Sequence, residues 1–280
     1  MKARNIDING EVLSYLDNEK GDTTLLFIHG AFINKEYWNN QLSYFAPSYR
    51  VVALDQAGHG KSSHNRTEWT GQNFGEDLCV FIEKLSLKNV VLIGHSFGSD
   101  VMLEAVANDS SSISGLIEVD HMKNVGVALP QEIADQLVQS LKTDFIRTCE
   151  QIARQTLVTE KTDPELVDRL LKDYSAMNPA VGVPLLQNGF NYVDRETELL
   201  KGLKQKLYLI HVNYSATNEE NLKVYLGDNY ALQTISGTCH YPMIENPDKF
   251  NAALEKILSK VKDNQPRIDL LGDRKENTRY

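Results

Sequence analysis

The segment Gly94-His95-Ser96-Phe97-Gly98 places a hydroxyl group between two glycines, where an apolar run ends and a helical pattern begins. A serine that attacks a carbonyl must stand on a sharp strand-to-helix turn, in a strained backbone conformation. Side chains two positions before and after it would crowd that turn, so glycine is needed at both places. The pattern G-x-S-x-G alone recurs by chance in glycine-rich loops, but this context predicts that Ser96 is a nucleophile.

Apolar runs that alternate with helical patterns predict the elements around this turn. Asn9-Gly10 joins two alternating runs, which predicts an antiparallel hairpin over residues 3–17. Buried strands are expected at 23–30, 49–55, 89–94 and 113–120, further strands at 206–212 and 230–236, and helices at 35–46, 73–85, 97–108 and 246–261. Such alternation indicates an α/β fold with a mostly parallel sheet, helices on both faces and the hairpin at one edge.

The alternation breaks after Asp120. Helical patterns follow at 131–142, 145–157 and 163–174, with no buried strand among them. We therefore expect a core of residues 1–122 and 201–262, an inserted helical cap at 123–200, and a polar tail at 263–280.

Four motifs together resemble the α/β-hydrolase superfamily, in its lid-bearing branch of esterases, lipases and C–C bond hydrolases. They are "FIHG" at 27–30, "DQAGHGKS" at 55–62, "GHSFG" at 94–98 and "GTCHYPMIENPDKF" at 237–250. The resemblance implies the α/β-hydrolase fold and a catalytic triad in the chain order serine, acid, histidine. One departure is Ser99-Asp100, where many members have another glycine; it bears on helix packing.

The catalytic base is expected at His240, one of seven histidines. It follows the last predicted strand and precedes the final helix, where the family's catalytic histidine lies. An imidazole with a pKa near 6.5 can accept the serine proton and return it near neutral pH. The neighbouring Cys239 is interpreted as a small residue at the strand end, because the sharp turn at residues 94–98, the nucleophile elbow, already holds a serine.

The usual position of the acid, after the strand at 206–212, holds no aspartate. Asn213 and Ser215 stand there, and neither can stabilise an imidazolium as a carboxylate does. Asp120 ends the preceding strand, a position that some members of the superfamily use, and it is our predicted acid. Glu219 and Asp228 are the alternatives, and an ordinary helix cap is the structural alternative for Asp120.

The oxyanion of a tetrahedral intermediate needs two N–H donors. The Phe97 N–H lies at a predicted helix N-terminus, and the resemblance implies the Ala31 N–H as its partner. Candidates to contact the substrate are Phe32, Met122 and Tyr241. An apolar cap suits an uncharged or acyl substrate.

Composition narrows the other possibilities. A net charge of −9 argues against nucleic acid and anionic membranes as partners. The three cysteines are far apart, no metal-binding spacing occurs, and no signal peptide or membrane span is apparent. We expect a cytoplasmic enzyme without metal or organic cofactor, with an undetermined oligomeric state.

These features predict a serine hydrolase that cleaves a carboxylic ester, or a related acyl bond, of a small uncharged or apolar substrate through an acyl-enzyme. Cofactor-free dioxygenase or lyase chemistry on the same triad is an alternative, because fold does not fix function. A small-ligand receptor with residual hydrolase activity is another. Haloalkane dehalogenase and epoxide hydrolase are disfavoured, since both need a carboxylate at the elbow, where this chain has Ser96.

Overall fold

The computed structural model describes residues 1–263, and its strands form one eight-stranded sheet within that range. The order across the sheet is β1-β2-β4-β3-β5-β6-β7-β8. β1 and β2 are antiparallel to their neighbours, and the remaining strands are parallel. The strands are β1 (Ala3–Ile8), β2 (Glu11–Asp17), β3 (Thr24–Ile28), β4 (Arg50–Leu54), β5 (Val90–His95), β6 (Ile113–Val119), β7 (Leu207–Val212) and β8 (Tyr230–Ile235). The predicted α/β class, with an antiparallel hairpin at one edge, is confirmed.

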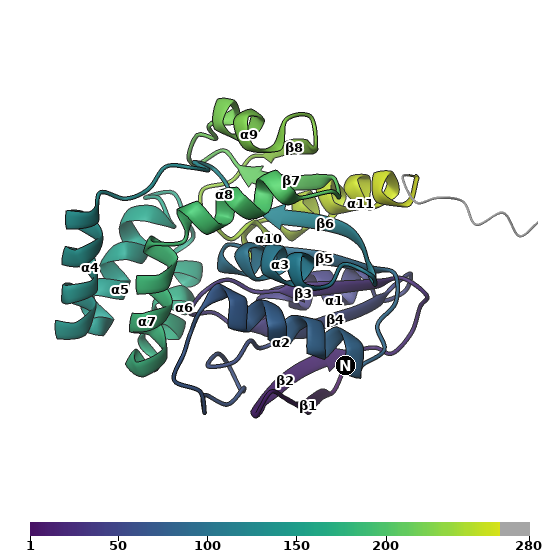
Figure 1. Cartoon of the computed structure of the whole chain (residues 1–280), viewed down its shortest axis with the longest axis horizontal. Helices are drawn as coiled ribbons and strands as arrows, with labels where there is room; N and C mark the ends of the chain where they lie inside the picture. The colour runs from purple at the N-terminus through teal and green to yellow at the C-terminus, as the bar shows by residue number, and fades with distance from the viewer. Residues whose placement is uncertain (264–280) are drawn as a thin grey trace, which may run out of the picture.

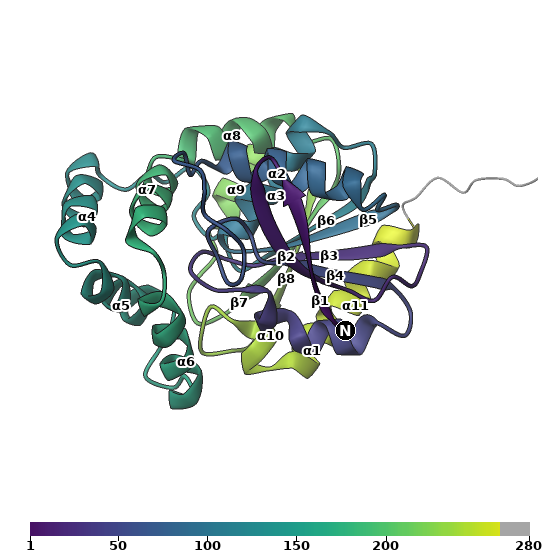
Figure 2. The ribbon, with the colours of Figure 1, turned by 90° about the horizontal axis from the view of Figure 1, so that it is seen from below.

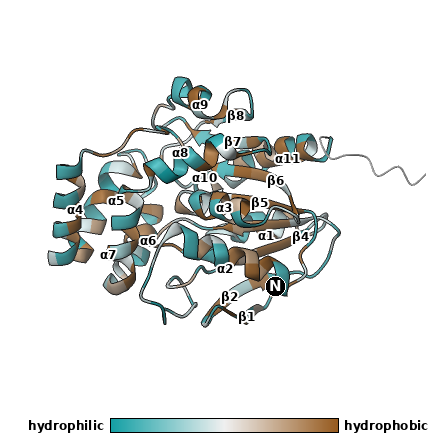
Figure 3. Ribbon diagram, viewed as in Figure 1, coloured by the Kyte–Doolittle hydropathy of each residue, from teal (hydrophilic) through white to brown (hydrophobic). Residues whose placement is uncertain are grey.

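The central parallel strands are mostly apolar because helices cover both faces of the sheet. Every residue of β3, β5 and β7 is buried, and Figure 3 shows the hydrophobic colour concentrated along the central strands. Figure 2 shows the layers: α2 (Gly71–Lys84), α3 (Phe97–Asn108) and α8 (Val193–Gly202) on one face, with α1 (Asn39–Phe45) and α11 (Pro247–Asp263) on the other. The remaining core helices are η1 (Lys35–Trp38), α9 (Glu219–Leu226) and α10 (Pro242–Glu245).

The helices between β6 and β7 do not all lie in one place. Figures 1 and 2 show α4 (Gln131–Thr143), α5 (Phe145–Thr156), α6 (Pro164–Ser175) and α7 (Pro179–Phe190) standing beside the sheet, whereas α8 lies along the core. The division predicted from the sequence, with 123–200 as the cap, stays a prediction; the helices that stand apart are α4–α7, and we use "cap helices" for these four. Of the tail predicted at 263–280, Asp263 ends α11 and residues 264–280 lie outside the described part of the chain.

Asp163 and Asn178 begin two of the cap helices. Their side chains accept hydrogen bonds from the backbone N–H of Glu165 and Ala180, and a proline follows each of them at the first helical position. Packing between the cap and the core is aromatic. The ring of Phe32, from the loop after β3, contacts Phe145 at 5.7 Å between centroids and Tyr174 at 5.2 Å.

Candidate functional site

Ser96 occupies the sharp turn between β5 and α3. Its φ of 53° and ψ of −128° are a conformation that non-glycine residues rarely adopt, and such strain is characteristic of functional turns. The flanking glycines permit the turn: a Cβ on Gly94 would lie 2.5 Å from the Gly98 carbonyl oxygen, and one on Gly98 would lie 2.5 Å from the Ile28 carbonyl oxygen. The backbone therefore holds Ser96 at the carboxyl end of a central strand, half-buried at the surface of a pocket.

His240 and Asp120 are hydrogen-bonded partners. Nδ1 of His240 lies 2.8 Å from Oδ2 of Asp120, and both side chains are buried. Nε2 of His240 has no hydrogen-bond partner among the described residues, although it is buried. That nitrogen is the one left to exchange a proton with a hydroxyl, while the carboxylate fixes the orientation of the ring.

Asp120 is held by donors from two other directions. Its Oδ1 accepts hydrogen bonds from the Val212 backbone N–H at 2.6 Å and forms an ion pair with Lys123 Nζ at 2.8 Å. Together with the contact to His240, these partners fix the position of both carboxylate oxygens. Sequence reasoning gave Lys123 no role, because nothing in the spacing shows that its side chain folds back onto the acid.

Lys123 also fills the place where the usual acid is missing. Its ammonium donates to the Val212 carbonyl oxygen at 2.7 Å and to Ser215 Oγ at 2.9 Å, and it lies 4.0 Å from the centroid of the Tyr214 ring. The turn after β7 therefore carries a cation beside Asp120 instead of a carboxylate. The two alternative acids, Glu219 and Asp228, are exposed, at the start of α9 and in the turn after it.

The two predicted oxyanion donors are available. The backbone N–H groups of Ala31 and Phe97 have no hydrogen-bond partner within residues 1–263, and both residues line the same pocket as Ser96. Phe97 is the first residue of α3, so its N–H also carries the partial positive charge of a helix N-terminus. The close approach at Gly30, where a Cβ would lie 3.0 Å from Ser96 Cβ, brings this loop against the elbow.

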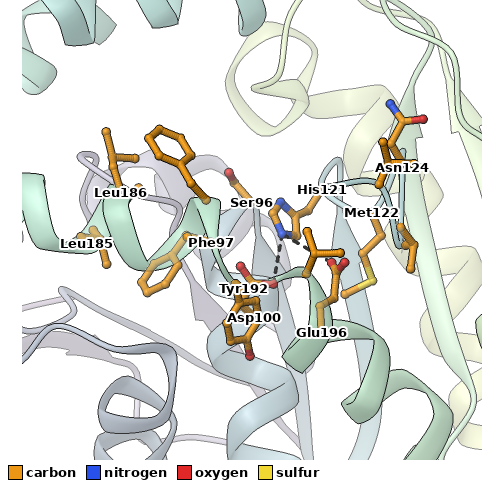
Figure 4. A pocket seen from close by; sticks show the side chains of 16 residues that line it. Ser96, Phe97, Asp100, His121, Met122, Asn124, Leu185, Leu186, Tyr192 and Glu196 are labelled. Atoms are coloured by element: carbon orange, nitrogen blue, oxygen red, sulfur yellow. Dashed lines mark hydrogen bonds and ion pairs between the residues drawn. The ribbon is translucent and has the colours of Figure 1, made fainter. Parts of the chain in front are cut away.

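A cavity of about 310 Å³ opens beside Ser96. The turn after β6 supplies Met122, α7 supplies Leu185 and Leu186, and α8 supplies Glu196, as Figure 4 shows. Met122 thus lies where the sequence places it. The cavity is large enough for a small acyl or alcohol group, and its wall is mostly apolar.

Phe32 and Tyr241 do not line this cavity. Phe32 packs beneath the cap helices, and the Tyr241 hydroxyl lies 3.2 Å from the Tyr174 hydroxyl in a buried contact. Both aromatics instead join the cap to the core, so these two predicted substrate contacts have no support in the pocket geometry. Both were predicted to contact the substrate because they are large aromatic residues next to site residues in the sequence. In the structure these side chains pack against the cap helices.

Three ionisable side chains in the cavity were not assigned to the site by the sequence. They are Asp100, one helical turn after Ser96, His121, next to Asp120, and Glu196, in the first turn of α8. The distance of four residues between Ser96 and Asp100 on a helix is a signal that could have been used. Nothing local predicts Glu196, because its helix comes from the other side of the insertion.

The charges of these three side chains shift the pKa values of His121 and Glu196. Partial burial alone would lower the pKa of His121, but the charges of Asp100 and Glu196 outweigh it and raise that pKa to about 10. Burial, together with the charge of Asp100, raises the pKa of Glu196 to about 7. At neutral pH His121 is therefore protonated, and Glu196 is about half ionised.

Other histidines and the cysteine near the site have structural surroundings. His95 Nε2 lies 2.8 Å from the His240 carbonyl oxygen, which ties the elbow to the loop that carries His240. His29 Nε2 accepts a hydrogen bond from the Gln56 backbone N–H at 3.0 Å, and so braces the loop after β3. Burial raises the pKa of Cys239 to about 12, so its thiol is not a nucleophile at neutral pH.

No helix within residues 1–263 has the length and apolar character needed to cross a membrane.

Comparisons with known proteins agree with this architecture. A pimeloyl-[acyl-carrier protein] methyl ester esterase of Pectobacterium carotovorum is 25% identical over 246 residues, which cover 82% of this chain and 92% of that protein. A thermophilic esterase from Thermogutta terrifontis superposes with a TM-score of 0.79 at 20% identity, covering 93% of this chain and 99% of that one. A bromoperoxidase from Bacillus anthracis gives the same TM-score at 18% identity, covering 92% and 100%. At such identities the two structures show the shared fold.

The family model of the α/β hydrolase fold matches residues 23–247, from the strand before the oxyanion loop to the helix after the predicted base. That range includes the elbow, the hydrogen-bonded Asp120–His240 pair and all the cap helices. The chain belongs to the α/β hydrolase fold family.

Proposed function

We propose that this protein is a serine hydrolase that cleaves a carboxylic ester through an acyl-enzyme. The observation that carries the proposal is the buried His240–Asp120 hydrogen bond, in a fold that presents Ser96 on a strained elbow between two unpaired backbone N–H groups. These are the parts that acyl transfer requires: a nucleophile, a base held in one orientation, and donors for the developing oxyanion. The esterase activity printed for the Pectobacterium relative supports the ester as the substrate class.

In the proposed reaction, Ser96 Oγ attacks the ester carbonyl carbon while its proton passes to His240 Nε2. The Ala31 and Phe97 N–H groups bind the oxyanion, and Asp120 stabilises the imidazolium. Collapse breaks the bond to the alcohol, which leaves with the proton from His240. Water then attacks the acyl-enzyme by the same route, with His240 as base, and releases the acid and Ser96.

The test is hydrolysis of p-nitrophenyl acetate and butyrate by the wild type and by Ser96→Ala. We expect turnover by the wild type, loss of at least about 10³-fold in kcat for the variant, and labelling of the wild type alone by a fluorophosphonate. Ser99→Ala is the matched control, because Ser99 lies in α3 with its hydroxyl bonded to the Gly94 carbonyl oxygen at 2.8 Å, buried behind the elbow. Absence of both turnover and labelling in the wild type would refute the proposal.

A further inference from the structure

The cavity beside Ser96 holds one buried carboxylate without a hydrogen bond. Glu196 is 8% exposed, and no group within residues 1–263 donates a hydrogen bond to its carboxylate. Its nearest charged neighbour is His121, whose Nε2 lies 3.9 Å from Glu196 Oε1. A buried carboxylate is costly unless cations or donors satisfy it, and His121 gives Glu196 only a distant ion pair and no hydrogen bond, so a bound cation could satisfy this side chain further.

His121 cannot be that partner for both carboxylates. Its Nε2 already lies 3.1 Å from Asp100 Oδ1, which is hydrogen-bonding distance, and an imidazole nitrogen has one proton to donate. Figure 4 shows Asp100 and Glu196 both directed toward the imidazole, with the shorter contact to Asp100. His121 and Asp100 therefore form a close pair, and the carboxyl group of Glu196 lies beside this pair in the cavity lining.

Aromatic residues line the same cavity. One is Tyr192, whose hydroxyl donates to Glu104 at 2.9 Å and is therefore not free to bind a ligand. Phe97 and Phe190 add two further rings to the lining. A carboxylate and aromatic rings that line one cavity are a combination by which proteins bind alkylated ammonium groups.

A divalent metal ion is the competing ligand for this cluster. The ligand atoms of Asp100, His121 and Glu196 lie within 4.8 Å of one another. A metal ion would have to take His121 Nε2, which already contacts Asp100 and, with a pKa of about 10, holds its proton at neutral pH. An organic cation needs no such displacement and can approach Glu196, the carboxylate in the cavity that has no hydrogen bond.

We propose that Glu196 and the aromatic wall of the cavity form a subsite for an alkylammonium group, so that the preferred ester carries a positive charge beside its reacting carbonyl. This inference rests on the proposed esterase function, and it replaces the uncharged substrate that the sequence predicts with a cationic one. Glu196 would contact the substrate, while Asp100 would hold His121 as an ion pair.

The test compares esters that differ only in charge. Choline butyrate and 3,3-dimethylbutyl butyrate place a trimethylammonium group or its neutral isostere on the alcohol side. The p-nitrophenyl esters of 4-(trimethylammonio)butyrate and 5,5-dimethylhexanoate do the same on the acyl side. For at least one pair we expect the wild type to favour the cation in kcat/KM by about tenfold or more, the size of a partly desolvated charge and cation–π contact.

Glu196→Gln keeps the shape of the side chain and removes its charge, so we expect the ratio of cationic to neutral kcat/KM to fall toward one. The control is Glu198→Gln on the same helix, where the carboxylate is exposed and paired with Arg195, and it should leave the ratio unchanged. A wild type without preference for the cation in either pair would overturn the inference, and this result needs no variant.

Two further measurements separate this inference from the proposed function. If the wild type hydrolyses the neutral esters and Ser96→Ala does not, the proposed esterase function is supported, whether or not the subsite exists. Calorimetric binding of the intact esters to Ser96→Ala, with and without Glu196→Gln, bears on the subsite alone, and we expect the same ratio there. One equivalent of a divalent metal ion in the purified protein, absent from Glu196→Gln, would overturn the subsite in favour of a metal site.

Discussion

Mutation of Asp120 tests the predicted mechanism most directly. It lies one strand before the usual position, yet its Oδ2 is 2.8 Å from His240 Nδ1. We expect Asp120→Asn to lower kcat by several hundredfold or more, toward the roughly 10⁴-fold loss seen when such an acid becomes an amide. The measurement is steady-state hydrolysis of p-nitrophenyl butyrate. Asp228→Asn is the control, and near-normal turnover of Asp120→Asn would move the acid elsewhere.

Lys123 gives a second prediction, because its ammonium pairs with Asp120 Oδ1 at 2.8 Å and both side chains are buried. In Lys123→Met the buried Asp120 side chain loses its cation, so we expect the free energy of unfolding to fall by about 3 kcal/mol. Urea denaturation measures this change.

The control for Lys123→Met is Lys123→Arg, which keeps the positive charge and should lose less stability. An equal loss in the two variants would contradict the prediction, because it would mean that the charge beside Asp120 is not what stabilises this part of the fold.

At the residue scale the sequence predicts the groups that lie close to the elbow in the family's order, and it misses those that arrive from elsewhere. Ser96, His240 and Asp120 each end or follow a recognisable strand, so chain order alone places them at one edge of the sheet. Glu196 reaches the cavity only because α8 folds back over α3, a contact between residues about 90 positions apart that no local pattern encodes.

The elements show the same contrast. The sequence predicts α4, α5 and α6 because their polar and apolar residues repeat with a helical period, and α6 has a clear N-cap at Asp163. It does not predict α7, where Gly182, Pro184 and Gly189 disfavour an isolated helix. Packing overrides this local preference: Val181 and Leu185 are buried, and a Cβ on Gly182 would lie 2.4 Å from the Phe145 ring.

The attachment of α8 to the core gives a prediction at the scale of the element. Glu104 is fully buried in α3 and accepts hydrogen bonds from Arg195 Nε at 3.0 Å and Nη2 at 2.8 Å. Arg195→Met leaves that carboxylate without its cation, so we expect the free energy of unfolding to fall by about 3 kcal/mol. Urea denaturation measures it.

Glu198→Gln is the control for this change, because it removes only the exposed pair between Arg195 and Glu198 and should cost about 0.5 kcal/mol or less. Equal losses in the two variants would show that the buried pair does not hold α8 to the core.

At the scale of the whole molecule, the predicted core strands and helices and their layering are confirmed, because alternating apolar runs leave few arrangements for a chain of this length. The lining of the cavity was not predicted. An apolar cap suggested an uncharged substrate, and sequence reasoning gave no role to the three ionisable groups that the core contributes to the cavity. Buried ionisable groups of this kind reduce folding stability. Hydrophobic periodicity in the sequence predicts only the apolar positions that stabilise the fold, so it does not reveal them.

This cost gives the last prediction, the pH dependence of stability. The pKa of Glu196 is about 7 in the folded protein against an ordinary 4.5, so the folded state binds more protons than the unfolded state between these values. Stability from this group is therefore lost as pH rises from about 4.5 to 7, by at most about 3 kcal/mol. Glu196→Gln does not titrate, so its free energy of unfolding relative to the wild type should rise by about 1–3 kcal/mol between pH 5 and pH 8.

Urea denaturation of both proteins at the two pH values measures this difference, with Glu198→Gln as the exposed control. The variant also loses the 3.9 Å contact with His121, which lowers its stability at both pH values while His121 stays protonated. The difference between pH 5 and pH 8 is therefore the informative quantity, not the stability at either one. A difference near zero would mean that Glu196 ionises in the folded protein as it does in the unfolded chain. Ionised Glu196 would then be no less stable in the cavity than in the unfolded chain, and a bound cation would gain nothing from compensating that cost.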